Sequence, residues 1–280
     1  MSPQDFDFIS TLIKSRSGLV LTPDKSYLLE SRLMPVARKH GLKGLDELIG
    51  VMRTRKEEAL IIEVTEAMTT NESFFFRDIK PFDLLRDEVL PPLLEKRAAQ
   101  KHLRVWCAAA SSGQEPYSIA IVLKELGAKM AGWKVDMVGT DISHDILNKA
   151  KGGQYSQFEV QRGMPITLLL KYFDKKDETW QIKDEIRNMV QYKYWNLLDD
   201  LKGLGGFDIV FCRNVLLYFE PETKAQVLDR IRSVMAEDGF LTLGAAETVV
   251  GITNAFQISS LGRGMYHPNP VQPEKAFAVG

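Results

Sequence analysis

The sequence has few of the features that mark secreted, membrane-spanning or metal-binding proteins. It contains two cysteines among 280 residues, Cys107 and Cys212, each within an apolar, strand-like run. Such a pair disfavours both a disulfide framework and a zinc site. The first residues lack the layout of a signal peptide, and no apolar run reaches the ~18 residues of a membrane-spanning helix. We therefore expect a cytoplasmic protein without membrane insertion and without a metal.

An excess of charge of one sign is also absent. The chain carries 36 Lys and Arg residues against 37 Asp and Glu residues, which gives a formal net charge of −1. Without a global basic field, nucleic acid is not expected as a partner. The apolar fraction of 45% and the charged fraction of 26% are ordinary for globular proteins, and the length suits one large domain or two smaller ones.

The first part of the chain has helical spacing of apolar residues and no convincing alternating strand. Helices are predicted over about 24–40, 45–55 and 57–69, and Thr22-Pro23-Asp24 provides a start signal for the first of them. We expect residues 1–80 to form a helical N-terminal domain.

From Leu103 onward, strand-like runs alternate with helical segments, which is typical of a parallel sheet with covered faces. The predicted fold class is therefore α/β, over residues 81–268, followed by a loose tail at 269–280. Strands are expected at 103–107, 135–139, 190–195, 207–212 and 240–245, helices near 115–127, 143–151 and 222–236, and an antiparallel hairpin at 256–259 and 264–267.

One segment interrupts this alternation. Residues 152–190 carry short strand-like pieces of their own around 179–187, and the aromatic residues Tyr172, Phe173 and Trp180 argue against disorder. Long loops inside compact domains usually carry function or are disordered. We predict an antiparallel β insertion at about 155–190; the alternative is an excursion without function.

The turn after the first predicted strand is rich in small residues, and residues 108–113 read Ala-Ala-Ala-Ser-Ser-Gly. Only Gly113 stands where a dinucleotide fingerprint has three glycines, and the P-loop lysine is missing, so pyrophosphate binding is disfavoured. A ligand without phosphates suits such a turn. Glu115 either contacts a cationic or hydroxyl-bearing ligand group or stabilises the N-terminus of the following helix.

Polar residues follow two further predicted strands. Asp141 ends one of them, where an acidic side chain accepts two ribose hydroxyls in nucleoside-binding α/β domains. The alternative is a helix N-cap, although Ser143 is available for that role. Arg213 and Asn214 end another strand, where a ligand site and a solvated loop give the same pattern. Together with the small-residue turn, these residues predict a nucleoside site without phosphate, which S-adenosyl-L-methionine fits.

Five segments resemble, in order, the motifs of one protein family. They are Thr69–Arg77, Ser112–Ala120, Gly139–Ser143, Tyr194–Leu198 and Phe211–Phe219. On these residues the chain resembles the chemotaxis receptor methyltransferases, the CheR family, over about residues 5–270. Five motifs in the right order are far more specific than any one of them.

The resemblance implies a fold and an activity. The fold is a Rossmann-like S-adenosylmethionine-dependent methyltransferase domain with a small antiparallel β insertion, preceded by an all-α N-terminal domain. The activity is methyl ester formation on receptor glutamates during sensory adaptation, with S-adenosyl-L-homocysteine as the product. The implied partner is the cytoplasmic helical bundle of a methyl-accepting chemotaxis receptor, and we expect the enzyme to be a monomer.

The resemblance also implies site residues. By this analogy Arg77 and Tyr218 lie near the reactive methyl group and are the catalytic residues. Ser73 stands where threonine is often found, but it keeps the hydroxyl. The implied cofactor contacts are Asn71, Ser73, Arg77, Glu115, Asp141, Asn196, Leu197, Arg213 and Asn214.

The implied chemistry makes modest demands on the protein. A glutamate carboxylate is already an anionic nucleophile, so methyl transfer from a sulfonium needs alignment and desolvation more than a general base. Arg77 is predicted to hold this carboxylate in line, and Tyr218 to orient the same oxygen or line the methyl pocket. Alternatively, Arg77 only pairs with Asp78 or Glu72, although sequence neighbours seldom pair well, and Tyr218 only packs under the sheet edge.

Receptor docking is predicted for a locally basic stretch, residues 32–56. Receptor methylation helices are rich in carboxylates, so a basic face beside the active site would steer them. The alternative is a solvated helical face. The docking residues are predicted to be Arg32, Arg38, Lys39, Arg53, Arg55 and Lys56.

Two further expectations concern specificity. Relatives that tether a receptor's C-terminal pentapeptide have a glycine-bearing extension before the position of Trp180, and this chain lacks it, so we expect docking that is independent of the pentapeptide. Nucleic-acid enzymes that methylate amino groups have an Asp/Asn-Pro-Pro-aromatic turn after the fourth strand. Here Asn214 is followed by Val-Leu-Leu-Tyr, so this class of methyltransferase is not expected. The alternatives are a non-catalytic S-adenosylmethionine-sensing module and methylation of another protein carboxylate.

Overall fold

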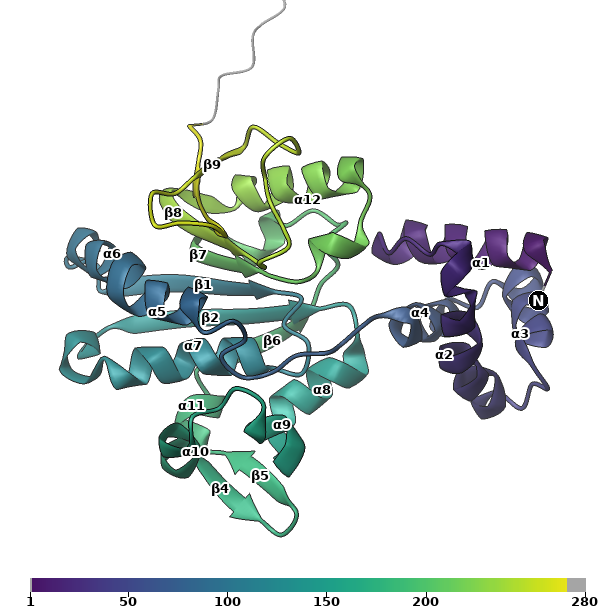
Figure 1. Ribbon diagram of the computed structural model, residues 1–280, viewed down its shortest axis with the longest axis horizontal. Coiled ribbons are helices and arrows are strands. Elements are labelled where there is room, and N and C mark those ends of the chain that lie inside the picture. Colours follow the sequence, from purple (N-terminus) through teal and green to yellow (C-terminus); the bar gives the residue numbers. More distant parts are fainter. Residues whose placement is uncertain (1, 271–280) are drawn as a thin grey trace, which may run out of the picture.

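The computed structural model describes residues 2–270 (Figure 1). Four N-terminal helices stand beside a larger body built on a mixed sheet, and a small second sheet projects from that body. The tail predicted at 269–280 lies outside the described residues from position 271 onward. No helix within the described part of the chain is both long and apolar enough to cross a membrane.

The N-terminal helices enclose an apolar core of their own. A capping box formed by Ser2 and Asp5 starts the first helix, and Ile13, Leu33 and Val64 are among the residues buried between the helices. The second, third and fourth helices confirm those predicted near 24–40, 45–55 and 57–69. The four are α1 (Pro3–Ser17), α2 (Ser26–Lys39), α3 (Leu45–Arg55) and α4 (Glu58–Met68).

The main sheet has seven strands in the order β6-β2-β1-β7-β8-β10-β9. The first five in this order run parallel, and β10 and β9 are antiparallel, which confirms the α/β class and the C-terminal hairpin. The strand predicted from residue 240 begins earlier, at Met235, which pairs with Phe207. The strands are β1 (His102–Ala108), β2 (Lys134–Asp141), β6 (Val190–Tyr194), β7 (Phe207–Cys212), β8 (Met235–Leu243), β9 (Phe256–Ile258) and β10 (Met265–Pro268).

Helices cover both faces of this sheet. In β1, Val105 and Cys107 belong to one apolar core, whereas Trp106 belongs to the other, as the alternation of side chains along a strand requires. Burial raises the pKa of the free thiols of Cys107 and Cys212, which lie in different cores. The first core is closed by α5 (Lys80–Leu84), α6 (Leu90–Lys96), α7 (Gln114–Glu125) and α8 (His144–Gly152), and the second by α12 (Pro221–Ser233).

The insertion contains the predicted antiparallel sheet, in the order β3-β5-β4. Only the first half of the strand-like stretch at 179–187 is a strand, because Asp184 and Glu185 begin a short helix with acidic residues in its first turn. A helix at Ile166–Tyr172 was not predicted. The elements are β3 (Gln154–Ser156), α9 (Gln157–Gln161), α10 (Ile166–Tyr172), β4 (Phe173–Lys176), β5 (Thr179–Ile182) and α11 (Asp184–Arg187).

The insertion packs closely against the segment that joins the N-terminal helices to the sheet. Gly163 follows α9 with a φ of 86°, and a Cβ atom placed on it would lie 1.9 Å from the carbonyl oxygen of Phe75. Phe75 itself is fully buried and contacts the rings of Tyr155 and Phe173 edge to face. The insertion therefore packs against the joining segment, residues 69–79, and fixes its position.

Replacement of Gly163 by alanine tests this contact. Gly163→Ala adds a steric overlap to the cost of a left-handed residue, so the free energy of unfolding should fall by about 2–5 kcal/mol. Gly41→Ala is the matched control, since Gly41 has a φ of 70° with no atom near its Cβ position, and it should cost only about 1–2 kcal/mol. Equal urea midpoints for the two variants would contradict the packing described.

Candidate functional site

One pocket lies where β1, β2 and β7 end and where segment 69–79 crosses the sheet. The catalytic and cofactor-binding residues predicted from the sequence, which come from five separate stretches of the chain, all line it. They are Asn71, Ser73, Arg77, Glu115, Asp141, Asn196, Leu197, Arg213, Asn214 and Tyr218. The structure thus brings the predicted residues together, while their individual roles stay predictions.

Asp141 forms the floor of the pocket at the end of β2. Its carboxylate accepts hydrogen bonds from the backbone N–H groups of Ser111, at 2.9 Å, and Ser143, at 3.1 Å. Ser143 caps α8, because its hydroxyl accepts the N–H of Ile146, so Asp141 does not serve as the cap. Burial raises the pKa of Asp141, and the backbone N–H groups oppose this rise. Each carboxylate oxygen keeps a lone pair for a further donor.

The small-residue turn after β1 brings backbone close to the same space. Ala109 and Ser111 have φ values of 58° and 51°, and Gly113 has a φ of 93°. A Cβ atom on Gly113 would lie 2.6 Å from the hydroxyl oxygen of Tyr192, so only glycine fits there. The Ser111 hydroxyl donates to the carbonyl of Asn71 at 2.8 Å, which ties the turn to segment 69–79.

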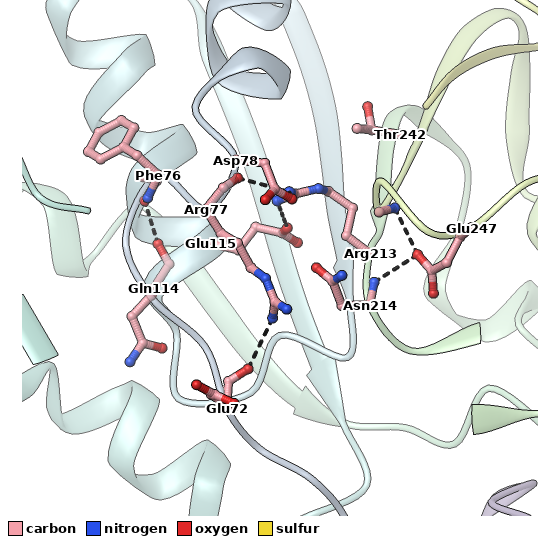
Figure 2. Close-up of polar contacts among 12 residues, drawn as sticks. Glu72, Phe76, Arg77, Asp78, Gln114, Glu115, Arg213, Asn214, Thr242 and Glu247 are labelled. Atoms are coloured by element: carbon pink, nitrogen blue, oxygen red, sulfur yellow. Dashed lines mark hydrogen bonds and ion pairs between the residues drawn. The ribbon is translucent and has the colours of Figure 1, made fainter. Parts of the chain in front are cut away.

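Arg213 is a buried cation at the end of β7, and its side chain is only 1% exposed. Figure 2 shows its guanidinium between two carboxylates: Nη1 lies 2.9 Å from Glu115 Oε2 and Nη2 lies 2.7 Å from Asp78 Oδ2. Nη2 also donates to the carbonyl of Arg77 at 2.8 Å. Burial raises the pKa of Glu115, and the charge of Arg213 opposes this rise.

Arg77 itself is not neutralised by an acidic side chain in the described residues. Its Nη1 donates to the backbone carbonyl of Glu72 at 3.2 Å, and its guanidinium lies 5.1 Å from the ring centre of Phe74. The alternative of a local ion pair with Asp78 or Glu72 is therefore wrong: Asp78 pairs with Arg213, and the Glu72 carboxylate pairs with Arg162. Arg77 keeps donors that can meet an incoming anion.

Glu247 supports the backbone of the pocket wall, and sequence reasoning missed it. It is 6% exposed and follows β8. One carboxylate oxygen accepts the N–H groups of Gly244 at 2.7 Å and Asn214 at 2.8 Å (Figure 2), and the other accepts those of Val215 at 2.9 Å and Leu217 at 3.2 Å. This carboxylate holds Asn214 in a left-handed conformation, with φ 60°, and shapes the turn that carries Tyr218.

The N-terminal helices supply part of the wall. Ser17 and Leu19, at the end of α1, line the pocket. The N–H of Val20 donates to the carbonyl of Tyr218 at 3.0 Å, and the Asn196 side chain donates to the carbonyl of Arg16 at 2.7 Å. Two predicted site residues are therefore fastened to α1 and the loop after it.

Further lining residues were missed although they adjoin the motifs. Trp195 directly precedes the predicted residue Asn196, and its buried indole N–H has no partner within the described chain. Its place inside the segment Tyr194–Leu198 was the available signal. Glu247 had none, since its partner Asn214 lies 33 positions away in the sequence.

The predicted docking residues differ in whether they already have a hydrogen-bond or ion-pair partner within the protein. Four of them have partners inside the protein: Arg32 donates to the carbonyls of Met68 and Thr69, and Lys39, Arg53 and Arg55 pair with Glu63, Asp5 and Glu57. Arg38 and Lys56 are exposed and form no ion pair with the residues described here. The free positive charge of the stretch is therefore smaller than its composition suggests.

Comparison with known proteins assigns the family. The model of the CheR methyltransferase, all-alpha domain matches residues 4–69, and that of the CheR methyltransferase, SAM binding domain matches residues 71–265. The chain belongs to the CheR family. It is 39% identical over 269 residues to chemotaxis protein methyltransferase 1 of Pseudomonas aeruginosa, covering 94% of this chain and 97% of that relative. It is 38% identical to chemotaxis protein methyltransferase Cher2 of Pseudomonas putida, with 94% and 97% covered.

CheR membership is consistent with the chemistry of the pocket. The family model is that of a domain binding S-adenosylmethionine, a ligand that has a ribose diol and no phosphate. Asp141 offers two carboxylate oxygens at the end of β2, and the small residues Ala109, Ala110 and Ser111 of the turn after β1 line the same pocket. The residues present therefore fit this cofactor.

Substitution of Glu247 tests the role of its carboxylate. Glu247→Gln turns an amide group toward N–H donors, so the turn holding Asn214 and Tyr218 should shift and kcat should fall about 10–100-fold. The change is read from methyl transfer at saturating cofactor. Glu237→Gln, which neutralises an exposed carboxylate of β8 that pairs with the buried Arg232, is the control. A kcat equal to that of this control would refute the assignment.

Proposed function

We propose that this protein transfers the methyl group of S-adenosyl-L-methionine to glutamate side chains of methyl-accepting chemotaxis receptors, and that it does so in the cytoplasm. The observation that carries the proposal is the assembly of all the predicted catalytic and cofactor-binding residues around one pocket, in a chain of the CheR family. The methyl ester that forms removes a negative charge from the receptor.

Asp141 is proposed to accept the two ribose hydroxyls of the cofactor. Asn71, Ser73 and Asn196 add polar groups to the walls, and Leu197 adds an apolar contact. The cofactor supplies an activated methyl group on a positively charged sulfur. The protein contributes position: Arg213 pairs with both Glu115 and Asp78 at the pocket wall, so its positive charge is compensated next to the cationic cofactor.

Arg77 and Tyr218 are proposed to act on the incoming glutamate. Arg77 keeps guanidinium donors free of carboxylates in the described structure, so it is able to hold one carboxylate oxygen while the other attacks the methyl group. Alignment of this kind accounts for much of the rate in a reaction whose nucleophile is already ionised. The backbone of Tyr218 is fixed by Val20 and by the Glu247 turn, which limits the positions its hydroxyl can take.

Docking is proposed to occur directly on the receptor bundle, without a pentapeptide tether. The turn between β4 and β5 has only two residues, Asp177 and Glu178, and Asp177 occupies it with a φ of 51°. No glycine-bearing extension is present at this hairpin. The exposed cations Arg38 and Lys56 then remain as candidates to attract the acidic helices.

Removal of the Arg77 guanidinium tests the catalytic proposal. Arg77→Ala should lower kcat about 100-fold or more, because the carboxylate loses its alignment, while the affinity for S-adenosylhomocysteine changes only a few-fold. The assay is release of base-labile, volatile methanol from a labelled receptor fragment. Arg86→Ala, which removes an exposed arginine paired with Asp83 and Asp87, is the control. Near-normal turnover of Arg77→Ala would refute the proposed catalytic role of Arg77.

Charge reversal tests the docking face. The double variant Arg38→Glu, Lys56→Glu should raise the KM for receptor about three- to tenfold at low ionic strength, and this effect should shrink as salt is added. The receptor fragment is used with and without its last five residues, and both should give the same KM with the unaltered enzyme. Lys202→Glu, at the amino ends of the strands, serves as the control. An unchanged KM in the double variant counts against this face.

A further inference from the structure

The backbone immediately after Arg77 is strained. Phe76, Asp78 and Ile79 all have positive φ values, of 49°, 68° and 48°. At Ile79 the ψ is −58°, and the N–H of Lys80 donates to the carbonyl of Asp78 across it, which forms a γ-turn of the rare, strained kind. Ile79 is β-branched, and such residues seldom occupy this region. Its side chain is nevertheless 63% exposed, so burial does not compensate for the strain.

Surrounding contacts hold this conformation in place. Asp78 is paired with the buried Arg213, which also binds the carbonyl of Arg77 (Figure 2). The N–H of Phe76 donates to the Ser118 hydroxyl at 3.0 Å, and the N–H of Ile79 donates to the carbonyl of Phe76 at 2.8 Å. Strain that is fixed from several sides in this way is characteristic of functional sites.

An exposed apolar residue lies within two positions of each predicted catalytic residue in the sequence. Ile79 lies two residues after Arg77, and Leu217, which is 42% exposed, directly precedes Tyr218. Both Arg77 and Tyr218 line the pocket, whereas Ile79 and Leu217 do not. We call Ile79 and Leu217 the apolar rim. A single exposed leucine is ordinary, but an isoleucine held outward by a strained turn is not.

The occupant of the rim follows from the size of a helix. An α-helix with its side chains is about 10–12 Å across, so a helix that inserts a glutamate into the pocket also covers residues flanking the entrance. In an amphipathic helix the residues three or four positions from the glutamate share its face. Such a residue meets the apolar rim when the glutamate meets Arg77.

We propose that the apolar rim recognises an apolar residue one turn away from the methylated glutamate on an acidic, amphipathic receptor helix. The proposal rests on the receptor methyltransferase function proposed above. It assigns sequence selection among glutamates to Ile79 and Leu217, apart from the basic face that attracts the bundle. The strained turn keeps Ile79 outward before the helix arrives, so no side chain has to be ordered on binding.

Ile79→Gly separates strain from contact. Glycine adopts a positive φ without cost, so the melting temperature of the full chain should equal or exceed that of the unaltered protein, while the KM for receptor fragment rises about tenfold. The Kd for S-adenosylhomocysteine should not change. Lys101→Gly is the control, since exposed Lys101 also has a φ of 48° but precedes β1 outside the pocket; it should leave KM unaltered.

Leu217→Ala tests the apolar rim a second time without changing the strained turn. It should also raise the KM for receptor fragment about tenfold. A receptor fragment with serine in place of the apolar residue one turn from the glutamate should lose the same factor with the unaltered enzyme and little with Ile79→Gly. If the KM for receptor fragment in both variants lies within twofold of that of the unaltered enzyme, recognition by the apolar rim is refuted, whereas the proposed methyltransferase function is not affected. Absence of base-labile methyl ester with the unaltered enzyme would overturn the proposed function, and the rim with it.

Discussion

The site depends on the burial of one guanidinium. Arg213 joins Glu115 at the start of α7, Asp78 in the joining segment and the carbonyl of Arg77. A guanidinium presents its donors in a rigid plane, so it sets the mutual positions of groups from three distant parts of the chain. A charge buried to this extent is tolerated only when its partners are in place. The sheet edge, the small-residue turn and the segment carrying Arg77 are therefore folded as a unit.

A buried anion plays the complementary part on the other side of the pocket. The Glu247 carboxylate gathers four backbone N–H groups, which would otherwise need water in a turn that is largely buried. Arg213 and Asn214 are sequence neighbours, yet the first is positioned by acidic side chains and the second by this carboxylate. The end of β7 is thus held by two separate sets of carboxylates: Asp78 and Glu115 bind Arg213, and Glu247 binds the backbone of Asn214.

Residues within continuous motifs were predictable, and residues that act across long separations were not. Asp141 and Asn214 follow apolar strand runs, so the sequence alone predicts that they lie at the carboxyl edge of the sheet. Asp78 was weighed only as a partner of its neighbour Arg77, because its real partner Arg213 lies 135 positions away. The pairing of the basic stretch 32–56 could not be predicted for a similar reason, since Asp5 and Glu63, which neutralise part of its charge, belong to other helices.

The hydrogen bonds from Val20 to Tyr218 and from Asn196 to Arg16 place the pocket at a seam, that is, at the interface between the N-terminal helices and the sheet. A ligand in this seam touches both sides, and it binds only when both are folded. By mass action such a ligand stabilises both parts together. A methyl donor bound in this pocket would therefore stabilise the contact between the N-terminal helices and the sheet, in addition to supplying the methyl group.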